Sequence, residues 1–189
     1  GGEPPVIEDR KAIEKACEAG NEVINVSIGT LGDEVGLPSA DQFLDGFGQS
    51  KFMKLLEERG CLVVKSAGNS GIRMKLDADL DDPIVKVGAT TSVSGTAVFS
   101  ATGELDAPGD DVFVLESGAI PADKRAGGRD RCDAAAGRFI KGTSFSAPLT
   151  AGVAAQVIGT LKTSTTFTSM SGKDRVRLTN RILRASTLA

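Results

Sequence analysis

The sequence of 189 residues contains no histidine, tryptophan or tyrosine. Without an imidazole, the chain cannot itself supply the usual general base near neutral pH, nor a histidine ligand for a metal. Long apolar runs are scarce as well. The longest, such as residues 23–28 and 151–158, are too short to cross a bilayer.

Charge is nearly balanced, with 22 basic and 25 acidic residues and a net charge of −3. No basic cluster favours nucleic acid or a membrane surface as a partner. The content of 40% hydrophobic and 25% charged residues is typical of a globular protein. A chain of this length can bury one core, so we expect residues 1–189 to form a single domain.

Cysteine is rare. Cys17, Cys61 and Cys132 are an odd number and show no C-x-x-C spacing. This pattern argues against a disulfide framework and against a zinc site. We therefore expect three small, buried, unpaired side chains.

Helical and strand-like patterns alternate along the chain. Apolar residues at helical spacing predict helices over residues 7–19, 39–59, 144–161 and 173–185. Short β-branched runs predict strands over residues 22–28, 61–64, 84–87 and 112–115. Alternating strands and helices favour an α/β fold, a parallel sheet with helices on both faces. Residues 163–171 read as a loop, and the aperiodic residues 117–138 as a surface insertion.

The sequence GTSFSAP at residues 142–148 opens the third predicted helix. Gly142 permits a tight turn, and a serine at a helix N-terminus lies among free backbone amides at the positive end of the helix dipole. Ser144 therefore stands where an oxyanion could be stabilised. The alternative is that Ser144 only caps the helix.

The sequence VKSAGNSG at residues 64–71 leads a predicted buried strand into a glycine-rich turn. This turn presents one carboxamide, that of Asn69. Asn69 is either a hydrogen-bond donor in a site or a residue that tolerates a left-handed turn.

Together, these two motifs and the sequence VINVSIG at residues 23–29 resemble, in their order, the subtilase family of serine proteases (peptidase S8). The resemblance implies a three-layer α/β fold and peptide-bond hydrolysis, with Ser144 as nucleophile and Asn69 in the oxyanion hole. It also implies that a peptide or protein substrate lies along a cleft, whose walls are Ser27, Ile28, Gly29, Ala67 and Gly68. Weaker similarities at residues 87–90 and 107–109 extend the resemblance from Ala12 to the last residue.

In subtilases the triad follows the order Asp, His, Ser, and the resemblance places both earlier members upstream of Ala12. We therefore expect a sheet that is incomplete on its N-terminal side. An N-terminal portion of the protease domain, in the same parent or as a separate chain, would supply Asp and His. Alone, this chain is expected to be inactive and to associate through its uncovered apolar surface. Most relatives are secreted.

Two alternatives remain. Sedolisin-like peptidases resemble subtilases but use glutamate in place of histidine. That branch typically carries aspartate where this chain has Asn69, and Glu14 and Glu18 lie on a different helix from its base. The second alternative is a non-catalytic subtilase-like domain used for binding or assembly, in which Ser144 is a relic.

Acidic residues give two weaker expectations. Glu104 and Asp106 lie in a segment that resembles part of a calcium or monovalent-cation site in some subtilases, although solvated loop charges are the alternative. The run Asp77, Asp79, Asp81 and Asp82 would favour basic substrates if it reaches a specificity pocket.

Overall fold

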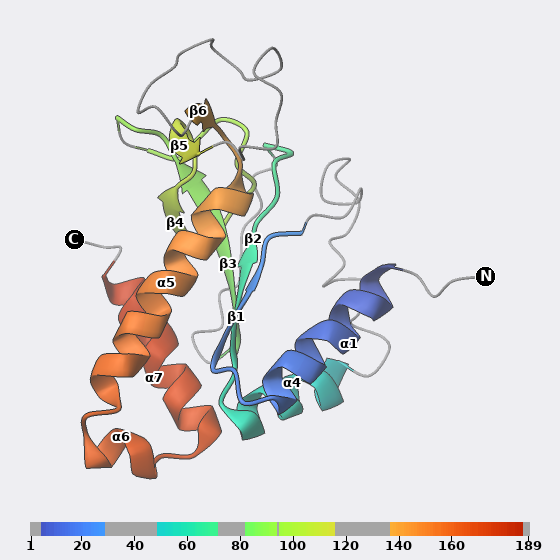
Figure 1. Cartoon of the computed structure of the whole chain (residues 1–189), viewed down its shortest axis with the longest axis vertical. Coiled ribbons are helices and arrows are strands. Elements are labelled where there is room, and N and C mark those ends of the chain that lie inside the picture. Colours follow the sequence, from blue (N-terminus) through green and yellow to red (C-terminus); the bar gives the residue numbers. More distant parts are fainter. Residues whose placement is uncertain (1–4, 29–48, 72–81, 94, 116–136, 187–189) are drawn as a thin grey trace.

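The computed structural model describes residues 5–28, 49–71, 82–93, 95–115 and 137–186. A sheet of four parallel strands lies at its centre, in the order β1-β2-β3-β4 (Figure 1). The strands are β1 (Val23–Val26), β2 (Leu62–Ser66), β3 (Ile84–Thr90) and β4 (Leu105–Pro108). The helices are α1 (Pro5–Glu18), α4 (Gln49–Arg59), α5 (Thr143–Leu161), α6 (Thr165–Ser169) and α7 (Gly172–Ala185).

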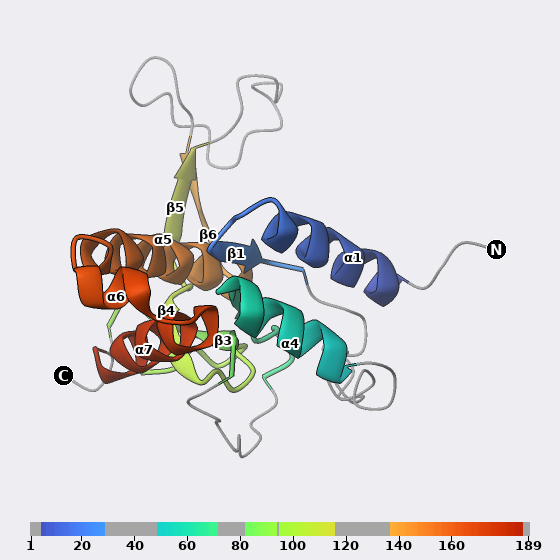
Figure 2. The same ribbon diagram turned by 90° about the horizontal axis from the view of Figure 1, so that it is seen from below.

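Helices cover both faces of the sheet, with α5 and α7 on one side and α1 and α4 on the other (Figures 1 and 2). Successive strand residues point to opposite faces. In β2, Leu62 and Val64 pack toward α5 and α7, whereas Val63 packs toward Phe52 and Leu56 of α4. Burial on both faces explains why β2 begins with the continuous apolar run Leu62–Val64. The helix-covered parallel sheet confirms the predicted α/β class.

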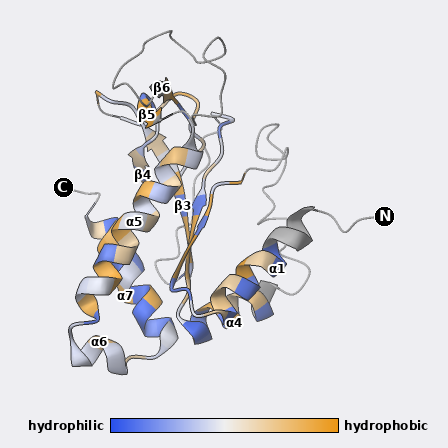
Figure 3. Ribbon diagram, viewed as in Figure 1, coloured by the Kyte–Doolittle hydropathy of each residue, from blue (hydrophilic) through white to orange (hydrophobic). Residues whose placement is uncertain are grey.

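Helix α5 has no charged residue, and most of it is coloured white to orange in Figure 3. Its small side chains Ala147, Ala151 and Ala154 pack in the core cluster with residues of the strands. These let the helix lie close enough to contact all four strands. By length and composition α5 is also suited to crossing a membrane. Its packing on β1 to β4 is that of a core helix, although Leu149 and Val153 on its outer side are each 48% exposed.

Several predicted elements need correction. The strand β5 (Val112–Leu115) is outside the parallel sheet and pairs antiparallel with β6 (Gly137–Ile140). The predicted loop at 163–171 contains α6, and β4 was missed because its sequence, LDAP, has no β-branched residue. Apart from Gly137 and Arg138 in β6, the predicted insertion at 117–138 lies outside the described residues, as does the first part of the predicted helix over 39–59.

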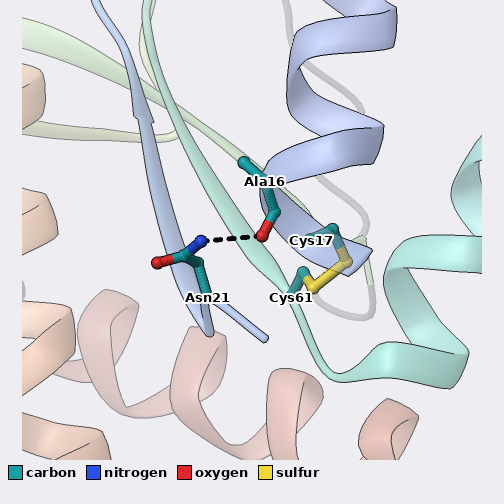
Figure 4. Close-up of a disulfide and its surroundings, with 4 residues drawn as sticks. All are labelled: Ala16, Cys17, Asn21 and Cys61. Atoms are coloured by element: carbon teal, nitrogen blue, oxygen red, sulfur yellow. Dashed lines mark hydrogen bonds between the residues drawn. A yellow bond between two sulfur atoms is a disulfide. The ribbon is translucent and has the colours of Figure 1, made fainter. Parts of the chain in front are cut away.

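Cys17 and Cys61 form a disulfide, which corrects the expectation of unpaired cysteines (Figure 4). The end of α1 packs beside the start of β2, and this brings the two Cα atoms to 5.9 Å although the residues are 44 apart in sequence. Cysteine number and spacing carry no sign of such a contact, because the helix-on-sheet packing creates it. Both residues are 1% exposed.

We expect loss of this disulfide, by substitution of both cysteines with alanine, to lower the free energy of unfolding by about 3–4 kcal/mol because the unfolded chain is then less constrained. Urea titration measures this change. Denatured, unreduced protein should show one reactive thiol, that of Cys132, and Cys132→Ala should show none. Three thiols in the wild type would contradict the bond.

A buried ion pair joins the loop before β4 to the end of α7. Arg184 Nη2 lies 2.8 Å from Glu104 Oε2, and the two side chains are 9% and 8% exposed. The Lys86 amide donates to the same oxygen at 3.3 Å, and Arg184 Nε donates to Asn180 Oδ1. Burial nevertheless raises the pKa of the Glu104 carboxyl above 4.5, and Arg184 offsets only part of this effect.

This raised pKa predicts a pH dependence of stability. Folding favours the protonated carboxyl, so its contribution is fully present below pH 4.5 and is lost as the pH rises through the folded-state pKa. Relative to Glu104→Gln, the wild type should therefore lose free energy of unfolding from about pH 4 upward, as measured by urea midpoints. Glu58→Gln, on α4, is the matched control and should follow the wild type. A wild-type curve that rises against Glu104→Gln would show the opposite sign.

Candidate active site

The candidate residues gather at the carboxyl ends of the parallel strands, the edge where open α/β sheets bind ligands. Asn69 follows β2, Gly109 follows β4, and Ser144 lies in the first turn of α5. The Gly142 amide donates to the Gly109 carbonyl at 2.8 Å, which fixes the start of α5 beside the end of β4. The end of β4 and the start of α5 are therefore held together by a backbone hydrogen bond.

Gly109 makes this close approach possible. A Cβ added at Gly109 would lie 2.6 Å from the Ala89 Cβ and 3.1 Å from the Gly142 carbonyl oxygen. Any larger side chain would push α5 away from β3. Glycine is therefore required at position 109 for the start of α5 to pack closely on β3.

Thr143 fixes the orientation of the Asn69 side chain. The Thr143 amide donates to Asn69 Oδ1 at 2.9 Å, and the Thr143 hydroxyl donates to the same atom at 3.2 Å. The hydroxyl in turn accepts the Gly68 amide at 3.1 Å. Since Oδ1 is held by Thr143, the Nδ2 group of Asn69 is directed away from it. A Cβ built on Gly142 would lie 3.6 Å from that Nδ2 group.

Ser144 is the second residue of α5 and is half-buried. Its backbone amide is one of the first four of the helix, which have no acceptor within the helix. The positive end of the helix dipole is also at this point. Asn69 Nδ2 lies near Gly142, two residues before Ser144. A backbone amide and a carboxamide are the kinds of donor that stabilise an oxygen on which negative charge develops.

Pro148 is the sixth residue of α5, beyond the first turn. The proline therefore does not replace one of the free amides at the helix start. It removes the amide that would bond to the Ser144 carbonyl, four residues earlier.

The candidate substrate residues share the same edge. Val26 pairs with Lys65, so Ser27 and Ile28 follow β1 beside the end of β2 and near Ala67. Ile28 is 54% exposed, and the side-chain Nδ2 of Asn25 donates to the Ser27 hydroxyl at 3.0 Å. Gly68, buried next to Asn69, has a φ of 103°, which favours glycine. Gly29 lies outside the described residues.

The acidic residues have local partners. Glu104 is paired with Arg184, and Asp106 Oδ2 accepts the Thr96 hydroxyl at 2.7 Å. Asp82 Oδ1 accepts the Ile84 amide at 2.8 Å and so begins β3. Asp77, Asp79 and Asp81 lie outside the described residues. In the part of the chain that the structure describes, no group of three or more acidic, cysteine or histidine side chains could hold a metal ion.

A family model, described as "Subtilase family", matches residues 4–185. The chain belongs to the subtilase family. This confirms the resemblance carried by the motifs at residues 142–148 and 64–71. No curated protein matches the chain.

Solved structures share the fold of this subtilase. A lanthipeptide protease has a TM-score of 0.68 at 22% identity, with 98% of this chain and 59% of that chain covered. The patellamide maturation protease PatA gives 0.59 at 24%, with 92% and 56% covered. The prenylagaramide maturation protease PagA gives 0.58 at 23%, with 85% and 52% covered. The chain thus spans a little over half the length of these structures.

Thr143 is the site residue that sequence reasoning missed. It is fully buried, and its role depends on contacts with residues more than 70 positions earlier. The only signal was its place between Gly142 and Ser144 in the motif. Hydroxyl residues are common at helix starts, so Thr143 did not stand out.

We call this chain combined with the expected N-terminal portion of the domain the assembled protease. Thr143→Val should lower its kcat/KM about tenfold, because Asn69 then loses one of its two hydrogen bonds to Thr143, a loss of about 1.4 kcal/mol in transition-state stabilisation. Thr143→Ser keeps the hydroxyl and should restore most of the activity. Hydrolysis of a peptide ester measures the rate, and a parallel thermal melt separates positioning from stability. Equal rates in the valine variant and the wild type would show that Thr143 does not position Asn69.

Proposed function

We propose that this chain carries the nucleophile and the oxyanion hole of a serine endopeptidase. Ser144 Oγ gives its proton to the general base and attacks the scissile carbonyl. The C–N bond breaks, the amine leaves with that proton, and water hydrolyses the acyl-enzyme to release the acid and restore the serine. The Ser144 amide and Asn69 Nδ2 donate to the developing oxyanion. Ser27, Ile28, Gly29, Ala67 and Gly68 hold an extended peptide or protein substrate on the acyl side by backbone contacts.

The observation that carries this proposal is the contact between Thr143 and Asn69. It holds the Asn69 carboxamide in one orientation, with Oδ1 bound to Thr143 at the start of α5, before any substrate binds. Such preorganisation is what electrostatic stabilisation of a transition state requires. A domain kept only for binding has no chemical need of a buried threonine that orients one exposed asparagine. The geometry therefore favours the enzyme over the non-catalytic alternative.

A histidine general base would come from outside this sequence, because the chain has no histidine. We propose that an upstream segment or a separate chain supplies the Asp and His of the triad. The chain's coverage of 52–59% of the matched structures supports this view. A sedolisin-like mechanism is less well supported, since the oxyanion position carries the neutral Asn69.

Labelling with a fluorophosphonate tests the split triad. The chain alone should react slowly or not at all, and its mixture with the N-terminal portion of the protease domain should react at Ser144. Ser144→Ala, in the same mixture, is the control that assigns the label. If no assembled form reacts, the enzyme proposal is wrong and a role in binding or assembly is favoured. If the chain alone reacts fully, the base lies within it.

Asn69→Ala should lower kcat of the assembled protease about 10²- to 10³-fold with little change in KM, because the lost donor acts mainly in the transition state. This magnitude is that of subtilisin, a member of the same family, and not one obtained from this structure. Asn69 is exposed, so the variant should fold normally. Asn21→Ala, an exposed asparagine that bonds to the Ala16 carbonyl, is the matched control. A change in KM alone would place Asn69 in ground-state binding instead.

A further inference from the structure

In the ribbon formed by β5 and β6, the two largest apolar side chains are exposed and the smaller ones are half-buried. Val112, Val114 and Ile140 are half-buried, whereas Phe113 and Phe139 are 56% and 65% exposed. A ribbon packed on a core normally turns its largest apolar side chains inward and its polar ones outward. The two aromatic rings therefore lie on the outer face, where they add little to the stability of the described structure.

The two phenylalanines form one patch, called here the aromatic pair. They are directly opposite each other across the ribbon, and their rings meet edge to face with centroids 5.4 Å apart. This contact holds both rings in place and leaves a continuous apolar surface. Large exposed apolar groups that are held in this way commonly mark an interaction site.

The aromatic pair is close to the candidate active site. Strand β6 ends at Ile140, and the chain then runs through Lys141 to the start of α5. The ribbon lies beyond the N-terminal end of α5 (Figures 1 and 2). Lys141 Nζ lies 5.7 Å from the centroid of the Phe99 ring.

Phe99 in turn borders the loop that carries Asn69. Its carbonyl accepts the Gly71 amide at 2.8 Å, and the Ala101 amide donates to the Gly68 carbonyl at 2.9 Å. Through Phe99 and Lys141, the loop that carries Asn69 is therefore connected to the strand that carries Phe139.

The order of strands in the sheet indicates that the leaving-group side of a substrate would lie nearer the ribbon. In the sheet order, β1 and β4 are at opposite ends. The proposed acyl-side residues Ser27 and Ile28 follow β1, whereas the ribbon follows β4. A peptide that enters along β1 and crosses Ser144 therefore leaves toward the ribbon.

The length of chain between Phe139 and Ser144 limits how far the aromatic pair can lie from the point of cleavage. Five residue steps separate Phe139 from Ser144, at most about 17 Å if fully extended. The turn at Gly142 shortens this path. An extended peptide covers the remaining distance with about three or four residues, at about 3.3 Å each.

We propose that the aromatic pair binds an aromatic or large aliphatic side chain located three or four residues beyond the scissile bond, on the leaving-group side. The inference rests on the proposed function, because it takes Ser144 as the point of cleavage. The bound side chain stacks on the edge-to-face rings at centroid distances of about 4.5–7 Å. It gives the protease a preference remote from the reacting atoms.

The test measures binding, which needs no triad, and so it is independent of catalysis. Pentapeptides with a free amino terminus represent the released leaving group, with one phenylalanine placed at each position of an otherwise Gly/Ser sequence. Isothermal titration calorimetry gives their dissociation constants, with this chain combined with the N-terminal portion of the protease domain and carrying Ser144→Ala so that no peptide is cleaved. Phenylalanine at the third or fourth position should bind about tenfold more tightly than serine, as expected for partial burial of a large apolar side chain.

In the double variant Phe113→Ala/Phe139→Ala, the affinity for the phenylalanine peptides should be about the same as for the serine peptide. Both residues are exposed, and circular dichroism would confirm the fold. Val93→Ala, at a position 86% exposed, is the matched control and should keep the preference. Equal affinity for all positions, a preference at the first two positions, or a preference that survives in the double variant would each overturn the inference.

The proposed function can fail separately. If the assembled protease neither reacts with a fluorophosphonate nor hydrolyses an ester, catalysis by Ser144 is wrong, whatever the pentapeptides show. If it hydrolyses short esters but the pentapeptides show no preference, only the aromatic pair is wrongly assigned. A double variant that changes sedimentation but not peptide binding would assign the patch to contacts between copies of the chain.

Discussion

The packing of α5 across four parallel strands is the constraint on which the other features depend. It requires small side chains on the inner face of the helix, Ala147, Ala151 and Ala154, and a glycine at position 109. This contact sets the height of the helix start relative to the strand ends. A displacement by one helical turn would move Ser144 by about 5.4 Å, too far for an oxyanion to reach both Asn69 and the helix amides.

Two loops far apart in sequence thus meet at one hydrogen-bonded residue. Thr143 contacts Asn69 through its backbone and its hydroxyl, and it contacts Gly68 through the same hydroxyl. The donors that we propose for an oxyanion are therefore held by the core of the chain itself. Proton transfer is separable from this arrangement, because the sequence holds no imidazole. Charge stabilisation and nucleophile activation belong to different parts of the protease we propose.

The α/β class, the parallel strands and most helix positions could be predicted from the sequence, because strands buried on both faces, such as β2 and β3, consist mainly of apolar residues. The approach of Asn69 to Ser144 came only from the family resemblance. Local patterns could not give the contacts that depend on tertiary packing: the Thr143 bonds, the Cys17–Cys61 disulfide and the pairing of β5 with β6. Strand β4 was missed for a different reason, since its LDAP sequence has low strand propensity and is held by its neighbour β3.

The disulfide also has a consequence for the integrity of the chain. Cys17 and Cys61 join α1 to β2, and the backbone between them includes β1 and α4. A cut at any peptide bond within that stretch opens the backbone but leaves both pieces covalently joined. The fragment that carries α1 then stays attached to the fragment that carries Asn69 and Ser144. A nicked form of this protein would keep its mass, apart from one added water, until a reductant separated the two pieces.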